Sequence, residues 1–265
     1  MGAVGKPNFE LSKWYLDAVG ENGEVFIGYR AALRWRRLQA SYAAALTGGA
    51  HETRTASSVR SEEEPVLRMG SLAWEAPALE LQGTWTGNAP ALLRTLYECP
   101  GGSVVWACLF PRAEAGVRIG ARNIRGLGYA ERLEMTLPPW RLPLETLRWG
   151  RFLSPDRFVV WIDWQAPERS RTWVFVDGQE EREARVSEEE ISFEGGRLRL
   201  PQASRLQLRD GRLSHFLSSL SLPLNLLCRA RAIHETKWRT RGVLECFGAP
   251  AVEGWAIHEV VRFRT

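Results

Sequence analysis

The chain has 265 residues, of which 45% are hydrophobic and 25% charged, as in folded globular proteins that bury a substantial core. No segment approaches the roughly 18 consecutive apolar residues of a membrane span, and the opening MGAVGKPNFELSKW lacks the apolar stretch of a signal peptide. We therefore expect a cytoplasmic protein without stable membrane insertion.

The net charge of +4 does not predict a nucleic-acid partner. Of the 35 basic residues only Lys6, Lys13 and Lys237 are lysines, and the arginines are spread along the chain. Scattered arginine is more typical of solvated strand faces than of a phosphate-binding stripe. The basic and aromatic cluster RAALRWRR (30–37) is too local to alter this expectation.

Most apolar segments are short, rich in Val, Ile, Phe, Trp and Tyr, and bounded by turn sequences such as ENGEV, CPGGSV, SPDRF and VDGQE, which predicts strands joined by hairpins. The stretch GYRAALRWRRLQASYAAAL (28–46) is ambiguous, and its alternation favours strand. The best helix candidate is NAPALLRTLYE (88–98), with Asn88 as a cap and Pro90 near the first turn.

Parts of the sequence recur, which indicates an internal duplication. SEEE at 61–64 returns at 187–190, and GYA at 128–130 returns as GWA at 254–256, both at the same offset. The rhythm of SLAWEAPALELQ is similar to that of RLRLPQASRLQL, and KWYLDAVGENGEVFIGY is a looser match to RWGRFLSPDRFVVWIDW. We expect a mostly β protein with two consecutive antiparallel β-barrels, at 1–137 and 138–265.

The four cysteines, Cys99, Cys108, Cys228 and Cys246, have neither CxxC nor zinc-ligand spacing. A cross-strand disulfide is conceivable in each half, but reduced buried thiols are favoured. Nucleotide, metal and serine-hydrolase motifs are absent from the sequence. We therefore expect neither a metal nor a cofactor.

The WY pair at 14–15, the GLGY strand at 126–129 and the Trp-rich hairpin that follows together resemble the carotenoid hydratase (hydroxyneurosporene synthase) family. The lipocalin-like tocopherol cyclases and pericyclases are its relatives. The resemblance implies two lipocalin-like (calycin) barrels and chemistry on an isoprenoid or polyene. The family's central strand has the pattern Gly-Tyr-x-Asp-His-x-Trp-Gly.

On that pattern Gly128 and Tyr129 match and Glu131 replaces the Asp, whereas Arg132 and Glu134 replace the His and Trp. The resemblance also implies a later Tyr-x-Asp pair whose Asp protonates an alkene, and Trp161 and Asp163 stand at that place. Loss of the His puts hydration of a carotenoid in doubt but leaves acid chemistry open.

The residues can also be interpreted without the family. Alternation places Tyr129 and Glu131 on one strand face with Leu133, which we expect to point inward, and a buried carboxyl there finds a partner or has its pKa raised. Asp163 lies in FVVWIDW, which is apolar on both faces, so we expect it to be buried. For both acids, and for Glu259, pairing with an arginine is the structural alternative.

We therefore expect acid-catalysed hydration, cyclisation or isomerisation of a hydrophobic small molecule, in one pocket between the two halves. Asp163 would donate the proton, with Glu131 and Tyr129 as further catalytic residues. The predicted substrate-binding residues are Trp161, Arg132, Glu134, Tyr15 and Trp14. The alternative is a non-catalytic carrier of a hydrophobic ligand. The sequence does not indicate the ligand's identity or the oligomeric state.

Overall fold

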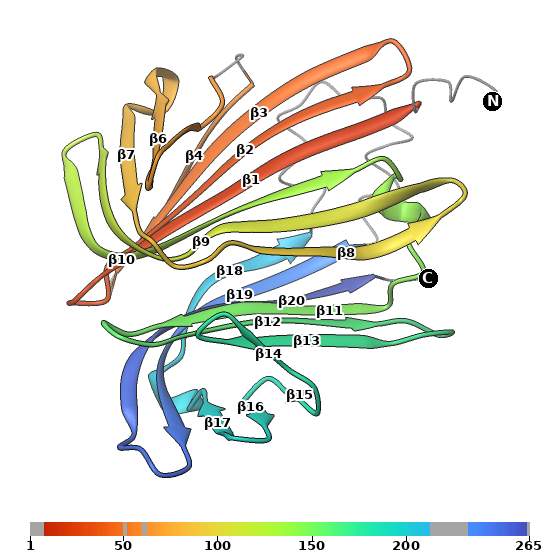
Figure 1. Cartoon of the computed structure of the whole chain (residues 1–265). Helices are drawn as coiled ribbons and strands as arrows, with labels where there is room; N and C mark the ends of the chain where they lie inside the picture. Colours follow the sequence, from red (N-terminus) through yellow and green to blue (C-terminus); the bar gives the residue numbers. More distant parts are fainter. Residues whose placement is uncertain (1–7, 50–51, 60–62, 213–232, 264–265) are drawn as a thin grey trace. The chain divides into compact units, whose positions relative to one another are not determined.

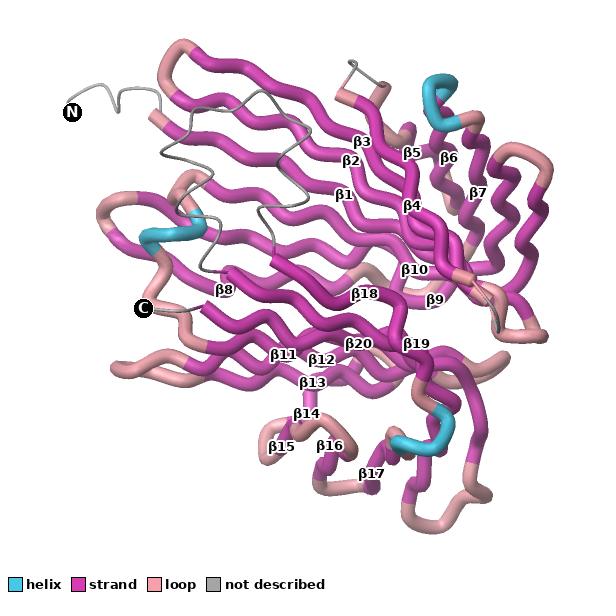
Figure 2. The backbone as a smooth tube through the Cα atoms, turned by 180° about the vertical axis from the view of Figure 1, so that it is seen from behind, coloured by secondary structure: helices cyan, strands magenta, loops and turns pink. Residues whose placement is uncertain are grey.

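A computed structural model of the chain describes residues 8–49, 52–59, 63–212 and 233–263, so that Ser61, Glu62 and Cys228 of the sequence analysis lie outside the described residues. Strands dominate, and Figure 2 shows only short helical segments. These are three-residue 3-10 helices, η1 (Pro77–Leu79), η2 (Pro139–Arg141) and η3 (Gln202–Ser204). The expectation of a mostly β protein is confirmed. Within the described residues, no helix has the length and apolar character needed to span a membrane.

The first antiparallel sheet has the strand order β4-β3-β2-β1-β10-β9-β7-β6-β5, with β8 also paired to β9 (Figure 1). Its strands are β1 (Phe9–Gly20), β2 (Val25–Trp35), β3 (Leu38–Gly48), β4 (Thr53–Ser58), β5 (Val66–Arg68), β6 (Ser71–Ala76), β7 (Leu81–Thr86), β8 (Leu92–Cys99), β9 (Gly102–Ile119) and β10 (Arg122–Met135).

The second sheet has the order β14-β13-β12-β11-β20-β19-β17-β16-β15, with β18 paired to β19. Its strands are β11 (Thr146–Leu153), β12 (Phe158–Gln165), β13 (Arg171–Val176), β14 (Gln179–Glu181), β15 (Arg185–Val186), β16 (Glu190–Phe193), β17 (Gly196–Arg199), β18 (Leu206–Arg212), β19 (Ile233–Cys246) and β20 (Val252–Phe263).

The second order repeats the first with every strand number raised by ten, so the predicted duplication of an antiparallel β-barrel fold is confirmed. The chain divides into two compact units. Unit 1 comprises Met1–Thr47 and Arg54–Leu142, and unit 2 comprises Gly48–Thr53 and Pro143–Thr265.

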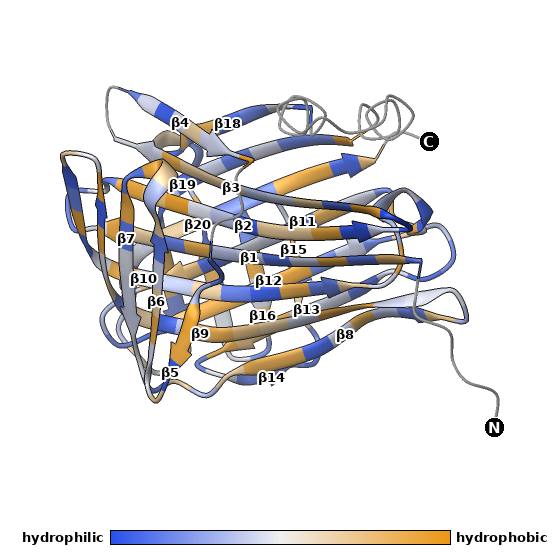
Figure 3. Ribbon diagram, turned by 90° about the horizontal axis from the view of Figure 1, so that it is seen from above, coloured by the Kyte–Doolittle hydropathy of each residue, from blue (hydrophilic) through white to orange (hydrophobic). Residues whose placement is uncertain are grey.

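Each sheet curls around an apolar cluster of its own. In unit 1, Leu16 of β1, Ala45 of β3 and Trp74 of β6 share one cluster although their strands are far apart in the sheet order. In unit 2, Phe152, Val174 and Leu198 do the same from β11, β13 and β17. The alternating colours along the strands in Figure 3 reflect the period of two that turns one face of each strand toward such a cluster.

Only some of the sequence matches correspond in space. Ala130 of GYA lies opposite Leu16, and Ala256 of GWA lies opposite Phe152, so these strands occupy equivalent places. The looser KWYLDAVG and RWGRFLSP match also joins equivalent hairpins, β1–β2 and β11–β12. The SEEE match does not, because Glu64 precedes β5 whereas Glu190 begins β16. The short charged motif therefore does not mark equivalent places, whereas the apolar hairpin does.

The NAPALLRTLYE segment contains a strand, β8, and not the helix that we expected. Leu92 and Leu96 are buried, and β8 forms a hairpin with β9 through the CPGG turn. Pairing with a long neighbouring strand outweighs the local helix propensity. Cys99 and Cys108 in this hairpin are free thiols, as the favoured interpretation predicted.

Strand β9 contains two consecutive irregularities beside β10. The pairing shifts by one residue between Gly128 and Ala130 and by one more between Ala130 and Glu131, so β9 carries two extra residues there. Pro111 lies in this irregular part, where a missing N–H is tolerated. The equivalent pairing of β19 with β20 shows no register shift.

Candidate functional site

Strands β1 and β10 bring two tyrosine and carboxyl pairs together on one face of unit 1. In the antiparallel register Tyr15 lies opposite Glu131, and Asp17 lies opposite Tyr129. The Tyr15 and Tyr129 ring centroids are 6.0 Å apart in an edge-on arrangement, and Tyr29 of β2 packs on Tyr15 at 5.4 Å. We call these five residues the tyrosine–carboxyl cluster. Tyr-x-acid spacing on adjacent antiparallel strands is sufficient to build it.

The carboxyl of Glu131 is fixed by two neutral donors. The Tyr129 hydroxyl donates to its Oε2 at 2.6 Å, and the Trp106 indole N–H donates to the same oxygen at 2.5 Å. Tyr129 and Trp106 are almost completely buried, whereas Glu131 is half-buried. A carboxyl that two hydrogen bonds hold in one orientation and that stays partly accessible is suited to exchanging a proton with a bound molecule.

Asp17, a member of the cluster, and the neighbouring Cys108 are both deeply buried. Asp17 is fully buried, and its Oδ2 accepts a hydrogen bond from the Tyr15 hydroxyl at 3.0 Å. Burial raises the pKa of the Cys108 thiol well above its usual value. Burial, together with neighbouring Cys108 and Glu131, also raises the pKa of Tyr129 well above 10, so that its hydroxyl stays a proton-bearing donor at neutral pH.

The predicted inward direction of Tyr129 and Glu131 is wrong in one respect. The face that joins the apolar cluster of unit 1 is that of Ala130, with Trp14 and Leu16, and the tyrosine–carboxyl cluster lies on the opposite face. Both Tyr129 and Ala130 are fully buried. Alternation alone could not separate the two faces because both are covered and the true core side presents a small alanine.

The other predicted residues of unit 1 lie on the Trp14 side of these strands. The guanidinium of Arg132 stacks over the Trp14 ring at 5.5 Å and pairs with Glu134 at 2.8 Å. Its Nε donates to Ser12. The predicted site residues of unit 1 therefore form two groups on opposite faces of the sheet, Trp14 with Arg132 and Glu134, and Tyr15 with Tyr129 and Glu131.

Asp163 lies in unit 2, is 2% exposed, and shares a strand face with Trp161, a member of that unit's apolar cluster. Its burial was predicted correctly. The carboxylate accepts hydrogen bonds from Arg148 at 3.0 Å, from Thr172 at 2.8 Å and from Gln165 at 2.6 Å. Both carboxyl oxygens are thus held by donors within unit 2. The arginine partner is thus present for Asp163, whereas Glu259 pairs with Lys237.

The predicted site includes neither Asp17 nor His258. Asp17 could have been found from the Tyr-x-Asp spacing in WYLD, which mirrors Tyr-x-Glu at 129–131. His258 is 3% exposed, bonds Thr240 through Nε2 at 2.8 Å, and stacks on Trp238. Its place next to the GWA repeat was the available signal.

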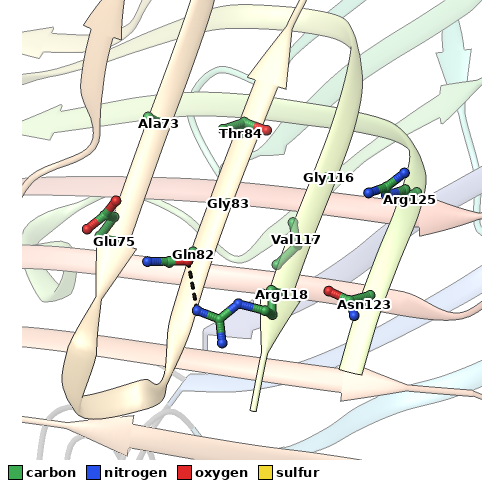
Figure 4. Close-up of a pocket in the computed structure, with 10 residues that line it drawn as sticks. All are labelled: Ala73, Glu75, Gln82, Gly83, Thr84, Gly116, Val117, Arg118, Asn123 and Arg125. Carbon is green, nitrogen blue, oxygen red and sulfur yellow. Dashed lines mark hydrogen bonds between the residues drawn. The ribbon is translucent and has the colours of Figure 1, made fainter. Parts of the chain in front are cut away.

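A groove of about 350 Å³ crosses the outside of the unit 1 sheet over β6, β7, β9 and β10 (Figure 4). Polar side chains line it, among them Glu75, Asn123 and Arg125, and Arg118 donates to Gln82 at 2.7 Å. This lining does not suit a hydrophobic ligand. Within the described part of the chain, no three His, Cys, Asp or Glu side chains are grouped to hold a metal ion.

Solved structures with the same architecture cover nearly the whole chain. CghA aligns with a TM-score of 0.57 at 12% identity over 97% of this chain and 89% of its own. The AttH-type protein NE1406 from Nitrosomonas europaea aligns at 0.56 and 10% over 97% and 93%. Kievitone hydratase from Nectria haematococca aligns at 0.54 and 10% over 96% and 89%.

The chain shares their fold. The two-barrel architecture that the family resemblance implied is thereby confirmed. No protein-family model matches the sequence, and no curated protein matches it. CghA has also been crystallised with Sch210972.

Proposed function

We propose that the protein is an enzyme that converts a hydrophobic small molecule by acid catalysis without a cofactor, with Glu131 as the group that exchanges the proton. The observation that carries the proposal is that hydrogen bonds from Tyr129 and Trp106 hold the Glu131 carboxyl on a buried aromatic face. The shared fold with kievitone hydratase supports it, since that name describes water addition by a protein of the same architecture.

In the proposed hydration, the proton of the Glu131 carboxyl adds to one carbon of an alkene. This step forms a C–H bond, leaves a carbocation on the other alkene carbon and leaves Glu131 as a carboxylate. Water adds to the cation, and the proton that it releases returns to the carboxylate. In cyclisation or isomerisation the carboxylate instead takes a proton from the rearranged cation. In both cases Glu131 ends as it began.

The remaining members of the cluster have distinct roles in the proposal. The ring faces of Tyr15, Tyr29 and Tyr129 stabilise the developing positive charge, as aromatic rings do for cations. Tyr129 and Trp106 keep the Glu131 carboxyl in one orientation throughout. Asp17 holds Tyr15 in place by accepting the hydrogen bond from its hydroxyl.

The role of Asp163 as proton donor and the pocket joining it to Glu131 stay predictions. Arg148, Gln165 and Thr172 already hold both carboxyl oxygens of Asp163, and this favours the second candidate, a carrier that binds a hydrophobic ligand without turnover.

Organic extraction of the purified protein, followed by mass spectrometry, identifies the bound molecule. Incubating that molecule with enzyme in D2O then separates the candidates. Acid catalysis leaves deuterium on carbon in the product, whereas a carrier returns the molecule unchanged.

Glu131→Gln keeps the size of the side chain and removes the transferable proton, so we expect product formation to fall by about 10²- to 10³-fold. Glu75→Gln, on an exposed position of β6, is the matched control and should retain full activity. A Glu131→Gln protein that still forms deuterated product at the normal rate would exclude Glu131 as the acid.

A further inference from the structure

The interior face of unit 2 contains a buried histidine held in an aromatic stack. Next to Ala256 of the apolar cluster, the His258 ring lies against Trp238 with centroids 5.3 Å apart and planes 30° from parallel, and Trp161 approaches it at 6.5 Å. Burial, followed by the charges of Arg205 and Lys237, lowers the pKa of His258 from 6.5 to about 3. The imidazole is therefore neutral at neutral pH.

The sequence makes room for this arrangement at Gly150. In the register, Gly150 lies opposite both Trp161 and His258. A Cβ at this position would be 2.2 Å from Cζ2 of Trp161 and 2.7 Å from Cβ of His258. The missing side chain lets the Trp161 indole lie across β11 toward the histidine. We call Trp161, Trp238 and His258 the aromatic box.

A neutral imidazole has two nitrogens that each need a hydrogen-bond partner when buried. Within the described residues, Thr240 supplies the one hydrogen bond found for His258, to Nε2. Farther along the same face, the Arg148 and Asp163 pair gives a polar end, and the Arg148 Nε is itself buried without a partner there. Flat apolar walls with polar groups at defined points are typical of a small-molecule site.

We propose that this region of unit 2 is a second ligand site, separate from the tyrosine–carboxyl cluster, for a neutral aromatic molecule that carries a hydroxyl group. The tryptophan rings stack on the ligand. In the tautomer whose Nε2–H donates to Thr240, the other nitrogen of His258 accepts a hydrogen bond from the ligand's hydroxyl, which makes the hydroxyl the group that is recognised.

The test is calorimetric titration of the full-length protein with 2-naphthol and with 2-fluoronaphthalene, which has a similar shape but no donor. We expect 2-naphthol to bind about tenfold to a hundredfold more tightly. His258→Phe, which keeps the stack and removes both nitrogens, should abolish that difference. His234→Phe, at a half-exposed histidine of the same strand pair, is the matched control and should preserve it.

Because His258→Phe leaves Thr240 without its partner, a measurement on the unmodified protein is also needed. In ¹⁵N spectra of the imidazoles, 2-naphthol should shift the His258 nitrogens and 2-fluoronaphthalene should not. Equal affinity for the two probes, no binding of 2-naphthol, or no shift of His258 overturns the proposal. Loss of 2-naphthol binding in Glu131→Gln but not in His258→Phe also overturns it, since the ligand would then lie in unit 1.

Discussion

The two units place different polar side chains on equivalent strand faces. With Ala130 and Ala256 taken as equivalent, Tyr15 corresponds to Arg151, Cys108 to Arg239 and Glu131 to Ile257. Unit 2 thus has two guanidiniums where unit 1 has a hydroxyl and a thiol. Arg151 is fully buried and donates to the carbonyl of Trp255, and Arg239 stacks on the Trp255 ring at 4.5 Å.

The comparison separates the scaffold from the chemistry. Strand order, the hairpin between the first two strands and the core-facing alanine are the same in both units, so these features are required by the fold. Most side chains on the other face differ, although Tyr129 and Trp255 are both aromatic, and this face is free to serve a reaction or a ligand. Fold alone therefore does not fix which unit reacts.

The largest expected effect comes from a buried ion pair of unit 2 whose place in unit 1 is taken by a tryptophan. Lys237 is 1% exposed and pairs with Glu259, with Glu235 at 3.6 Å, whereas the equivalent position of β9 is Trp106. Lys237→Met leaves a buried carboxylate without its cation and should lower the free energy of unfolding by about 3–5 kcal/mol. Urea unfolding measures it.

Trp106→Phe is the matched change in unit 1. It removes the hydrogen bond to Glu131 and part of a buried ring but leaves no unpaired charge, so it should cost about 1–3 kcal/mol. If both variants lost the same stability, the two faces would be energetically alike and the comparison would fail.

The next effect tests the aromatic box. Gly150→Ala forces a methyl group against Trp161 and should destabilise unit 2 by about 2–3 kcal/mol through overpacking. Gly116→Ala is the control in unit 1, because its Cβ would lie 3.7 Å from Thr84 Oγ1, an ordinary contact, and stability should stay nearly unchanged. Thermal unfolding of both variants measures the difference in stability. A Gly150→Ala protein as stable as the unmodified one would show that the Trp161 indole is free to move.

The pH dependence of stability sharpens the comparison further, because His258 has a folded pKa of about 3 against 6.5 when unfolded. Below pH 6.5 His258 binds a proton in the unfolded chain but stays neutral in the folded one. The contribution of His258 to stability is therefore full above pH 6.5 and falls as the pH falls toward 3. Between pH 7.5 and 5 the loss should be about 2 kcal/mol. His258→Phe should remove this part of the pH profile, and His234→Phe should leave it; an unchanged profile in His258→Phe would contradict the assignment.

The sequence predicts the architecture well and the site only in part. Turn sequences and apolar hairpins identified the strands, and GYA and GWA located the closing strand of each unit. The sequence could not predict which face of a strand points to the apolar cluster, because β10 and β12 are covered on both sides and both of their faces are buried. It also could not predict the partner of Asp163, because Arg148 lies next to it only through the β11–β12 register. The Tyr-x-Asp spacing in WYLD pointed to Asp17, but nothing in the sequence distinguished it from an acid on the surface.

The double irregularity in β9 lets this strand change in length without losing its faces. Each irregularity absorbs one extra residue of β9, and the residues on either side of it stay opposite their partners in β10. Deleting one residue between Leu109 and Arg112 would therefore remove one irregularity and leave Cys108 opposite Glu131, and deleting two would give the regular pairing that β19 and β20 have. The segment thus acts as a reserve of chain length beside the tyrosine–carboxyl cluster.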